Sequence, residues 1–488
     1  MSVPGLPPAV TAALRAVAGD DHAVWVVGGY IRDQLLQRPV EDADLAVAGD
    51  PRFLANAIGA GLDGAVFPLS HEHGAWRVTL RHPIDGLAQL DITAMRGSIE
   101  ADLRGRDFTI NAVAALPEGG QPVDPFDGIA DLRTRTIRLV SAEAIRADPL
   151  RALRGVRHAA ELGFTIDPAS AQVIARDAGL IVRAAGERQR DELLRALDTP
   201  RGAESIRLLD RLTLLDHVIP ELEATRGCTQ PKEHYWNVFD HSVETVAVLD
   251  CILAPTPTSA FCRRRVEAIR RHWPPQDADP ARWSEPIAER HTRRALLKLT
   301  GLLHDVSKPE TRTVEPDGRI RFFGHPDRGA AVVGAILRRL RFSAREVKLA
   351  ELLIREHLRP GQLAAPGEVP TARALYRFFR DLDGEVSDLL ALNLADGAAA
   401  AGPRQRPHQW EAHTAYTGWI LRQRIERQVL TKPKRLVTGN DLIAELGMAQ
   451  GPELGRILAA LTEAEAAGEV TTRGEALDYA RVLREAGS

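Results

Sequence analysis

Short apolar runs that end at turns fill the first part of the chain. Val24–Val27 is an apolar run that stops at Gly28 and Gly29, and residues 30–36 then show helical spacing. Strands of this length that alternate with helices and turns are typical of a small α/β sheet domain. The other predicted elements of this part are a short helix at 9–19 and strands at 43–46, 76–80, 89–93 and 137–140.

The periodicity becomes helical after residue 140. Leu150, Leu153 and Val156 lie on one helical face, and few strand signals follow. The stretch 254–286 is rich in Pro, Arg and Trp and is expected to be an insertion or an ordered loop, and 398–406 has the composition of a linker. The pattern predicts four parts: an α/β head at 1–140, a helical neck at 141–230, a helical domain at 231–400 and a helical tail at 401–488.

Composition narrows the class of protein. The 488 residues carry a formal net charge of −3 and are 44% hydrophobic, which excludes a disordered chain and a uniformly basic nucleic-acid coat. The three cysteines, Cys228, Cys251 and Cys262, form no CxxC pair, so we expect neither a disulfide framework nor a zinc site. The N-terminus lacks the pattern of a signal peptide, and no run of about 18 apolar residues occurs. A cytoplasmic protein without a membrane span is expected.

Acidic residues on predicted strands are the first candidates for chemistry. Asp42 and Asp44 lie at i and i+2, so both carboxylates share one face of a strand, where they repel each other. Asp91, between apolar residues of another strand, would be a third acid; an edge carboxylate is the alternative. Three carboxylates can hold two Mg²⁺ ions about 4 Å apart, one for a 3′-hydroxyl and one for a triphosphate.

Gly28 and Gly29 close one predicted strand and open a helix. Without side chains, they would let backbone N–H groups approach a phosphate at the helix N-terminus. A plain turn is the alternative for a glycine pair taken by itself.

Histidines and acids form a second constellation in the helical part. Their order resembles that of the HD phosphohydrolase superfamily, and the two additional histidines match the members that hold two metals. The resemblance implies a divalent transition metal or Mg²⁺ and a water with a lowered pKa as nucleophile. Lys308 would contact a phosphate, with an exposed charge as the alternative. The implied metal ligands are His241, His304, Asp305, His325, His357 and Asp396.

The head motifs resemble those of the class II tRNA nucleotidyltransferase and bacterial poly(A) polymerase family. Gly105 replaces the first arginine of the family's RRDFTINA block, and Ala147 replaces the glutamate of its EDxxR block. Some bacterial members carry an HD domain behind the head. The resemblance implies a polymerase-β-like head with a mixed sheet, an all-α RNA-binding neck, an HD domain and a helical tail. The matching blocks are 28–33 with 42–44, 106–112, 124–132, 148–154, 187–193 and, at the start of the HD domain, 228–241.

The resemblance also implies a role for individual head residues. Asp42 and Asp44 would be the metal ligands, with Asp91 as the third catalytic acid. An N-cap ahead of Pro149 is the alternative for Asp148, and both roles are compatible. The implied nucleotide-binding residues are Arg32 and Arg106 on the triphosphate, Asp107 on the ribose, Asp148 and Arg151 on the base edge, and Gly28, Gly29, Asn111 and Arg154 around them.

The implied activity is template-independent addition of nucleotides to tRNA 3′ ends, with tRNA, CTP and ATP as partners. A poly(A) polymerase, and an HD phosphohydrolase whose head binds RNA, remain alternatives. CCA-adding relatives carry a longer flexible loop after the third-strand arginine, which here is Arg96. Only residues 97–101 separate Arg96 from Asp102, a span of at most about 17 Å. This spacing favours CC-only addition over full CCA addition, unless residues 67–75 substitute for the loop; A-only addition is a further alternative.

The tail contains a basic patch at 422–435. We interpret it as a solvated helix face rather than as a contact with tRNA.

Overall fold

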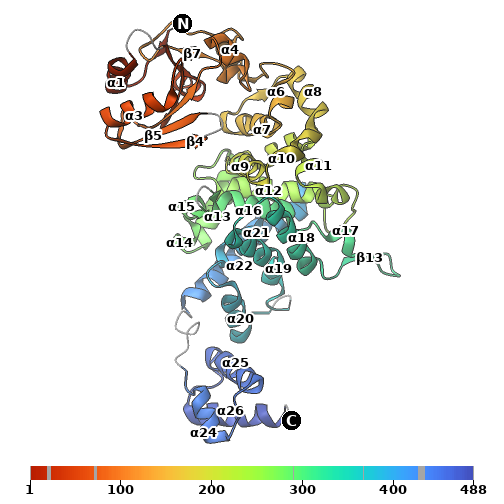
Figure 1. Cartoon of the computed structure of the whole chain (residues 1–488). Helices are drawn as coiled ribbons and strands as arrows, with labels where there is room; N and C mark the ends of the chain where they lie inside the picture. The colour runs from red at the N-terminus through yellow and green to blue at the C-terminus, as the bar shows by residue number, and fades with distance from the viewer. Residues whose placement is uncertain are drawn as a thin grey trace. The chain divides into compact units, whose positions relative to one another are not determined.

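The computed structural model describes residues 2–18, 23–70, 74–288, 291–365, 368–426 and 435–486. The chain divides into two compact units (Figure 1): Met1–Glu192 with Leu208–Val218, and Leu193–Arg207 with Ile219–Ser488. The finer division into four parts stays a prediction.

A six-stranded mixed sheet forms the centre of the first unit. Neighbouring strands are antiparallel except β3 and β6, which run parallel and set Asp44 beside Asp91. The predicted α/β head with a mixed sheet is confirmed, and β4 is a strand that the pattern did not predict. The strands follow the order β4 (Gly64–Ser70), β5 (Ala75–Ile84), β6 (Leu87–Ala94), β3 (Asp42–Val47), β2 (Val24–Val27) and β7 (Ala114–Ala115).

The main apolar core of this unit lies on one face of the sheet. Helices α1 (Pro8–Ala18) and α3 (Pro51–Gly61) pack there, and β3 contributes Ala43, Leu45 and Val47. Because side chains alternate along a strand, Asp42 and Asp44 lie on the opposite face, where they are exposed. The alternation therefore separates the core of the head from its candidate site.

Short elements complete the first unit. The predicted strand at 137–140 is limited to β9 and an isolated pairing of Leu139 with Phe108. Helices α9 and α10 have residues in both units. The elements are β1 (Val3–Pro4), α2 (Gly29–Leu35), α4 (Ile99–Arg104), η1 (Thr109–Asn111), β8 (Gly119–Gly120), α5 (Gly128–Thr134), β9 (Thr136–Ile137), α6 (Ala144–Ala147), α7 (Leu150–Leu162), β10 (Thr165–Ile166), α8 (Pro168–Arg176), η2 (Ala178–Arg183), α9 (Gly186–Leu197), α10 (Gly202–Arg211) and α11 (Leu215–Val218).

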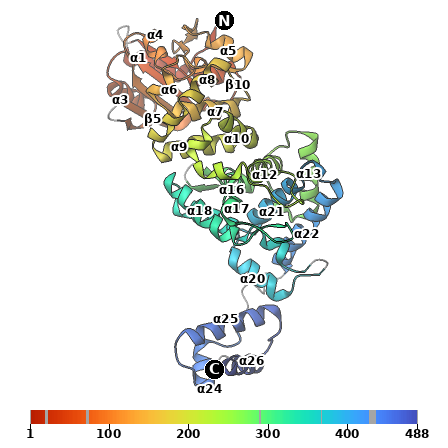
Figure 2. The same cartoon turned by 90° about the vertical axis from the view of Figure 1, so that its right-hand side faces the viewer.

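Long helices with buried faces build the second unit (Figure 2). Helix α12 packs on α16 and α21, and α18 packs on α19. The fully buried Lys298 of α16 forms an ion pair with Asp250 of α12 at 2.7 Å, so the core contains a paired charge. The helices of this core are α12 (Val238–Leu253), α16 (Arg293–Leu303), α18 (His325–Arg339), α19 (Ala344–Glu356) and α21 (Val386–Ala401), with α20 (Ala372–Leu382) beside them.

Shorter elements connect these helices. They are η3 (Pro220–Thr225), α14 (Pro275–Ala278), α15 (Ala281–Ser284), β11 (Pro286–Ala288), β12 (His291–Thr292), α17 (Lys308–Thr311), β13 (Arg312–Val314), β14 (Ile320–Phe322), η4 (Arg359–Gln362) and η5 (Gly402–Arg404).

Two expectations about this unit were wrong. The stretch 254–286 is largely helical and includes α13 (Ala260–His272), which Ser259 caps and which buries Val266 and Ile269 against the unit. A disulfide joins Cys251 to Cys262, with a Cα–Cα distance of 4.8 Å. The pairing was missed because α12 and α13 come together only in the fold.

The expected linker at 398–406 was also placed too early. Ala398 and Ala399 are buried residues of α21, which continues to Ala401 before the break at Gly402. Small side chains there allow close helix packing and do not mark a loop.

Helices also form the tail, as predicted. The helix α22 (Pro407–Glu426) packs on α13, and α24 (Gly439–Leu446), α25 (Pro452–Ala467) and α26 (Arg473–Glu485) share a small apolar core. Residues 427–434 of the basic patch lie outside the described residues. Arg424, within the described part, forms an ion pair with the buried Asp277 at 2.7 Å. Across the described part of the chain, no helix is both long and apolar enough to cross a membrane.

Candidate functional sites

The parallel pairing of β3 with β6 positions the acids of the head. Asp44 is the register partner of Asp91, and Asp42 precedes it on the same face of β3. Arg77 of β5 holds Asp91 from the other side: its Nε and Nη2 each donate to a carboxylate oxygen of Asp91 at 2.7 Å. Asp91 is therefore a neighbour of the pair, with both oxygens engaged by a guanidinium.

The carboxylate of Asp44 lies in a crowded, charged environment. Although solvent reaches part of the residue, the protein atoms crowded around its carboxylate disfavour the charged form and raise its pKa to about 6, with Asp91 and Asp42 adding to the rise and Arg106 opposing it. When neighbouring groups disfavour the charged form of a carboxylate, a nearby cation stabilises that charged form. Asp42 and Asp44 fit a divalent cation with oxygen ligands in this respect.

Gly28 has a steric reason to be glycine. Its φ is +74°, and a Cβ there would lie 2.7 Å from Nη1 of Arg106 and 3.4 Å from Oδ2 of Asp44. Arg106 reaches the acids through the space that the missing side chain leaves, and the plain-turn alternative therefore accounts for only part of the geometry. Gly29 is less constrained, since its Cβ would meet only Nη2 of Arg32 at 3.7 Å.

A buried polar network lies behind Arg106. Asp107 accepts hydrogen bonds from Asn111 Nδ2 at 3.1 Å and from Arg154 Nη1 at 2.9 Å. Burial opposes ionisation of Asp107, but the Arg154 guanidinium and the two hydrogen bonds hold its pKa well below the usual range. Arg32 joins the network by donating to Asn111 Oδ1 at 2.8 Å. The sequence-predicted residues Arg32, Asp107, Asn111 and Arg154 are thus brought together, bonded to one another.

The base-reading candidates are also engaged by the protein. Asp148 accepts from the backbone N–H of Leu150 at 3.1 Å, as the N-cap alternative requires, and from Arg188 Nη2 at 3.2 Å. Arg151 donates to the carbonyl of Gly105 at 2.6 Å, while its Nε lacks a partner among the described residues. Asp148 keeps acceptor capacity, whereas the unpaired Nε of Arg151 is enclosed, so Arg151 would reach a base after releasing one of the carbonyls that it binds.

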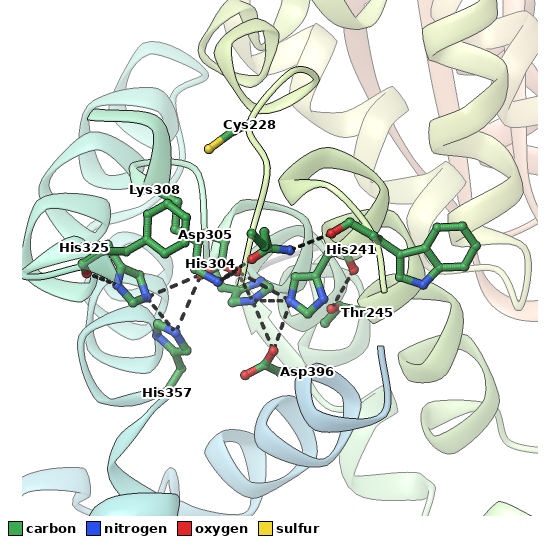
Figure 3. A network of polar contacts seen from close by, with 12 residues as sticks. Cys228, His241, Thr245, His304, Asp305, Lys308, His325, His357 and Asp396 are labelled. Carbon is green, nitrogen blue, oxygen red and sulfur yellow. Dashed lines mark hydrogen bonds and ion pairs between the residues drawn. The ribbon is translucent and has the colours of Figure 1, made fainter. Parts of the chain in front are cut away.

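Six ligand-type side chains converge in the second unit (Figure 3). His241 comes from α12, His304 and Asp305 follow the last turn of α16, His325 begins α18, His357 follows α19 and Asp396 lies near the end of α21. The groups of described residues whose ligand atoms lie within 4.8 Å are His241 with His304 and Asp305, His304 with His357 and Asp396, and Asp305 with His325 and His357.

Asp305 bridges two halves of this cluster. Its Oδ2 lies 3.2 Å from His304 Nε2 and 3.4 Å from His241 Nε2, while its Oδ1 lies 3.4 Å from His325 Nε2 and 3.8 Å from His357 Nε2. Asp396 Oδ1 lies 3.0 Å from His241 Nε2. A carboxylate shared between two histidine pairs is an arrangement suited to two cations.

Backbone hydrogen bonds fix the orientation of three histidine rings. The Nδ1 atoms of His304, His325 and His357 bond the carbonyls of Gly301, Phe322 and Ile354 at 2.8, 2.7 and 2.6 Å. Because a carbonyl only accepts, Nδ1 must carry the proton, which leaves the Nε2 lone pair of a neutral ring facing the centre.

The electrostatics of the cluster favour positive charge. Burial lowers the pKa of His304, but Asp305 and Asp396 outweigh that effect and raise it to about 10. Burial and the charge of His304 lower the pKa of His357 to about 4. The buried carboxylates therefore favour a positive charge between them, which a proton on His304 or a divalent transition metal or Mg²⁺ in its place would supply.

Lys308 is buried beside the cluster. Its Nζ lies 2.6 Å from Oδ2 of Asp305 and donates to Oε1 of Gln230 at 2.8 Å. The alternative of an exposed charge is therefore wrong.

Comparisons with known proteins agree with these two sites. Residues 24–138 match the family described as Poly A polymerase head domain, 163–225 match the probable RNA and SrmB-binding site of polymerase A, and 280–396 match the HD domain. The A-adding tRNA nucleotidyltransferase of Deinococcus radiodurans is 38% identical over 92% of this chain and 93% of its own. The CC-adding enzyme of Thermus thermophilus is 34% identical over 94% of each.

Solved structures share the fold. The Bacillus stearothermophilus CCA-adding enzyme in complex with CTP superposes with a TM-score of 0.62 at 21% identity, covering 99% of this chain and 100% of the other. The Thermotoga maritima CCA-adding enzyme complexed with tRNA gives 0.59 at 18% identity, with 98% and 96% covered. With two sites of this kind and relatives of this extent, the chain belongs to the family of class II tRNA nucleotidyltransferases and bacterial poly(A) polymerases.

Several residues of the two sites were not predicted from the sequence. Arg77 lies on a different strand from Asp91, and only the sheet register brings them together. His158 of α7 lies on the same helical face as Arg151 and Arg154 and is buried against Asn111 Nδ2 at 3.2 Å. His234 packs edge-on against His241 at a centroid distance of 5.5 Å. The spacing of His158, four and seven residues after Arg154 and Arg151, is the signal that could have found it.

Replacing Gly28 by alanine should raise the KM for the incoming nucleotide by about tenfold, or about 1.4 kcal/mol. The new Cβ would displace Arg106, and the alanine would hold φ +74° and ψ −127°, a sparsely populated conformation that costs an L-residue about 1–3 kcal/mol. Gly29→Ala is the matched control and should leave KM nearly unchanged. Steady-state kinetics of both variants check this, and equal KM values would contradict the role given to the close approach.

Proposed function

We propose that this protein adds nucleotides to the 3′ ends of tRNA without a nucleic-acid template. CTP would supply C residues, and ATP would supply a terminal A if the reaction continues to that position. The observation that carries the proposal is the placing of Asp42 and Asp44 on the open face of β3, next to the Gly28 turn and Arg106. The relatives named above, which span almost the whole chain, are tRNA nucleotidyltransferases. The cytoplasm, where tRNA and nucleotides are found, is the proposed location.

The head residues would have different roles in nucleotidyl transfer. Asp42 and Asp44 would hold Mg²⁺, with Asp91 as the third acid behind them; bound Mg²⁺ supplies the charge that activates a 3′-hydroxyl and steadies a triphosphate. Arg106, whose guanidinium lies beside the Gly28 turn, would contact the triphosphate. Arg32 would do so after releasing Asn111 or Asp33, to both of which its guanidinium donates.

The neighbouring network would position the nucleoside. Asp107, held by Arg154 and Asn111, keeps the loop after Arg106 in place and presents its charge to a ribose. Asp148 accepts and Arg151 donates, which together suit the Watson–Crick edge of a base.

We propose CC-only addition as the product. Residues 97–101 form a capped helix start, in which Ser98 Oγ accepts from the backbone N–H of Ala101 at 3.3 Å. A turn tied to α4 in this way cannot act as a long lever over the pocket. The competing segment 67–75 begins in β4, and its residues 71–73 lie outside the described residues.

Single-A addition is the second candidate. The 38% identical relative from Deinococcus radiodurans is named A-adding, whereas relatives from Thermus thermophilus and Geobacter sulfurreducens, at 34% and 32%, are named CC-adding.

The second unit would hydrolyse phosphoesters independently of the head. His241, His304, Asp305 and Asp396 would hold one divalent transition metal or Mg²⁺, and His325 and His357 would hold a second with Asp305 shared. The bound cations supply a water of lowered pKa. Lys308, paired with Asp305, lies where a phosphate would be contacted.

Asp44→Asn should lower incorporation of labelled CTP into tRNA lacking its CCA end by at least about 10³-fold, because the variant loses a charge that holds Mg²⁺. Asp63→Asn, on an exposed turn of the head, is the control and should retain full activity. Circular dichroism establishes that both variants fold. Near-normal incorporation by the folded Asp44→Asn variant would refute the assignment of the head.

The product length separates the remaining candidates. With tRNA lacking its CCA end, CTP and ATP, we expect two C residues and then a stop, and with tRNA ending in CC and ATP alone we expect no extension. Sequencing gels resolve the products. Efficient single-A addition to tRNA ending in CC would replace CC-only with full CCA addition if tRNA lacking its CCA end also receives CCA, and with A-only addition if that tRNA is not extended. Long A tracts would identify a poly(A) polymerase.

His304→Ala should abolish metal-dependent hydrolysis of a phosphoester such as bis-p-nitrophenyl phosphate while leaving nucleotide addition unchanged. The reason is that His304 is a member of two of the three groups of candidate metal ligands. It lies outside the strands that carry the acids of the head. His408→Ala, an exposed histidine of the same unit, is the control. Loss of both activities in a folded variant would contradict separate sites.

A further inference from the structure

A pocket between α13 and α22 lies outside both sites. Its volume is about 350 Å³, and its lining includes Phe261, Trp410 and four arginines, Arg264, Arg265, Arg271 and Arg406. The helices that form it pack against each other within the second unit. Neither the nucleotidyl-transfer site nor the metal cluster uses any of these residues.

Arg265 lies in the wall of this pocket, and one of its hydrogen-bond donors has no acceptor among the described residues. Only 8% of the residue is exposed, and its guanidinium lies between the rings of Phe261 and Trp410, at 4.4 and 4.6 Å from their centroids. Nη2 donates to Oε1 of Gln405 at 2.6 Å, but Nη1 has no acceptor among the described residues. A buried donor without an acceptor costs stability, and because Nη1 is itself enclosed, an anion in the pocket would offset the charge of the guanidinium.

The charge of Arg265 is also poorly compensated. Burial lowers its pKa to about 10, with Glu244 as the opposing influence. Glu411, on the pocket wall, is already paired with Arg271 at 2.6 Å and with His272 at 2.7 Å. A second acid of the lining, Glu267, is exposed to solvent. Because four arginines outnumber the two acids of the lining, the pocket favours a ligand that brings negative charge.

The rim adds cations and an aromatic surface. Arg264 and Arg406 are exposed and form no ion pair within the part of the chain that the structure describes. Phe261 is 53% exposed, so part of its ring is open to solvent. Arginines beside an exposed aromatic ring suit a phosphate joined to a base, because the ring stacks on the base while the guanidinium groups bond the phosphate.

We propose that this pocket binds a nucleoside phosphate, with the phosphate on Arg264, Arg265 and Arg406 and the base against Phe261. A free nucleotide and one residue of an RNA strand share this chemistry. The site gives the segment 254–286 a role that is separate from the reaction in the head.

Binding by full-length variants tests the proposal. The pocket variants are Arg264→Glu with Arg406→Glu, and the milder Phe261→Leu, which keeps an apolar side chain but loses the stacking face. The matched control is Arg263→Glu with Arg270→Glu, which reverses two exposed charges of the same helix outside the pocket. Fluorescence anisotropy with labelled tRNA lacking its CCA end measures RNA affinity, and equilibrium dialysis with 5′-CMP measures bound nucleotide.

Three results are distinguishable. The first result is that the pocket variants bind tRNA about tenfold or more weakly than the control variant does, and that their binding depends less on salt. This result would assign the pocket to an RNA strand. A loss of one equivalent of bound 5′-CMP, with tRNA affinity equal to the control, would assign it to a free nucleotide. Unchanged binding of both probes would overturn the proposal.

The test is independent of the proposed function. At saturating tRNA the pocket variants should add nucleotides at the wild-type rate, because they leave the head intact. Failure of the wild-type protein to extend tRNA would count against the proposed function and leave the comparison of binding valid.

Discussion

Repulsion between neighbouring carboxylates shapes both sites of this protein. In the head, Asp42, Asp44 and Asp91 project from paired strands, and Arg77 and Arg106 lie against them. In the second unit, Asp305 and Asp396 are surrounded by four histidines and Lys308. Charges held this close are stable only with cations beside them, so each cluster is arranged for cation binding before any ligand arrives.

The two sites meet this requirement in different ways. The head uses guanidinium groups, which keep their charge and leave Asp44 with a pKa of about 6, so that its carboxylate still gains from a metal. The second unit uses imidazoles, three of which are oriented by backbone carbonyls so that their lone pairs face the centre. The two clusters therefore differ in the cationic side chains that oppose their carboxylates.

The helices of the second unit carry more than the metal ligands. Buried pairs such as Lys298 with Asp250 connect α16 to α12, and the disulfide between Cys251 and Cys262 ties α12 to α13. This fixes α13 against the core, and its outward side then forms, with α22, the arginine-rich pocket. The stretch that looked like a loop in the sequence is a rigid part of the unit because its apolar residues, Val266 and Ile269, are buried.

The sequence by itself determined the class of fold and the chemistry of most of the site. Period-two alternation placed Asp42 and Asp44 on one face of a strand, because local spacing encodes which side chains share a face. The order of histidines and acids, through its resemblance to the HD superfamily, pointed to the side chains that converge in the second unit. Only the tertiary structure decided which groups oppose them. Arg77 meets Asp91 through sheet register, His234 reaches His241 across a loop, and Cys251 meets Cys262 between two helices. These contacts form only when separate segments pack together. The number of residues between two segments does not predict how far apart they lie in the folded protein.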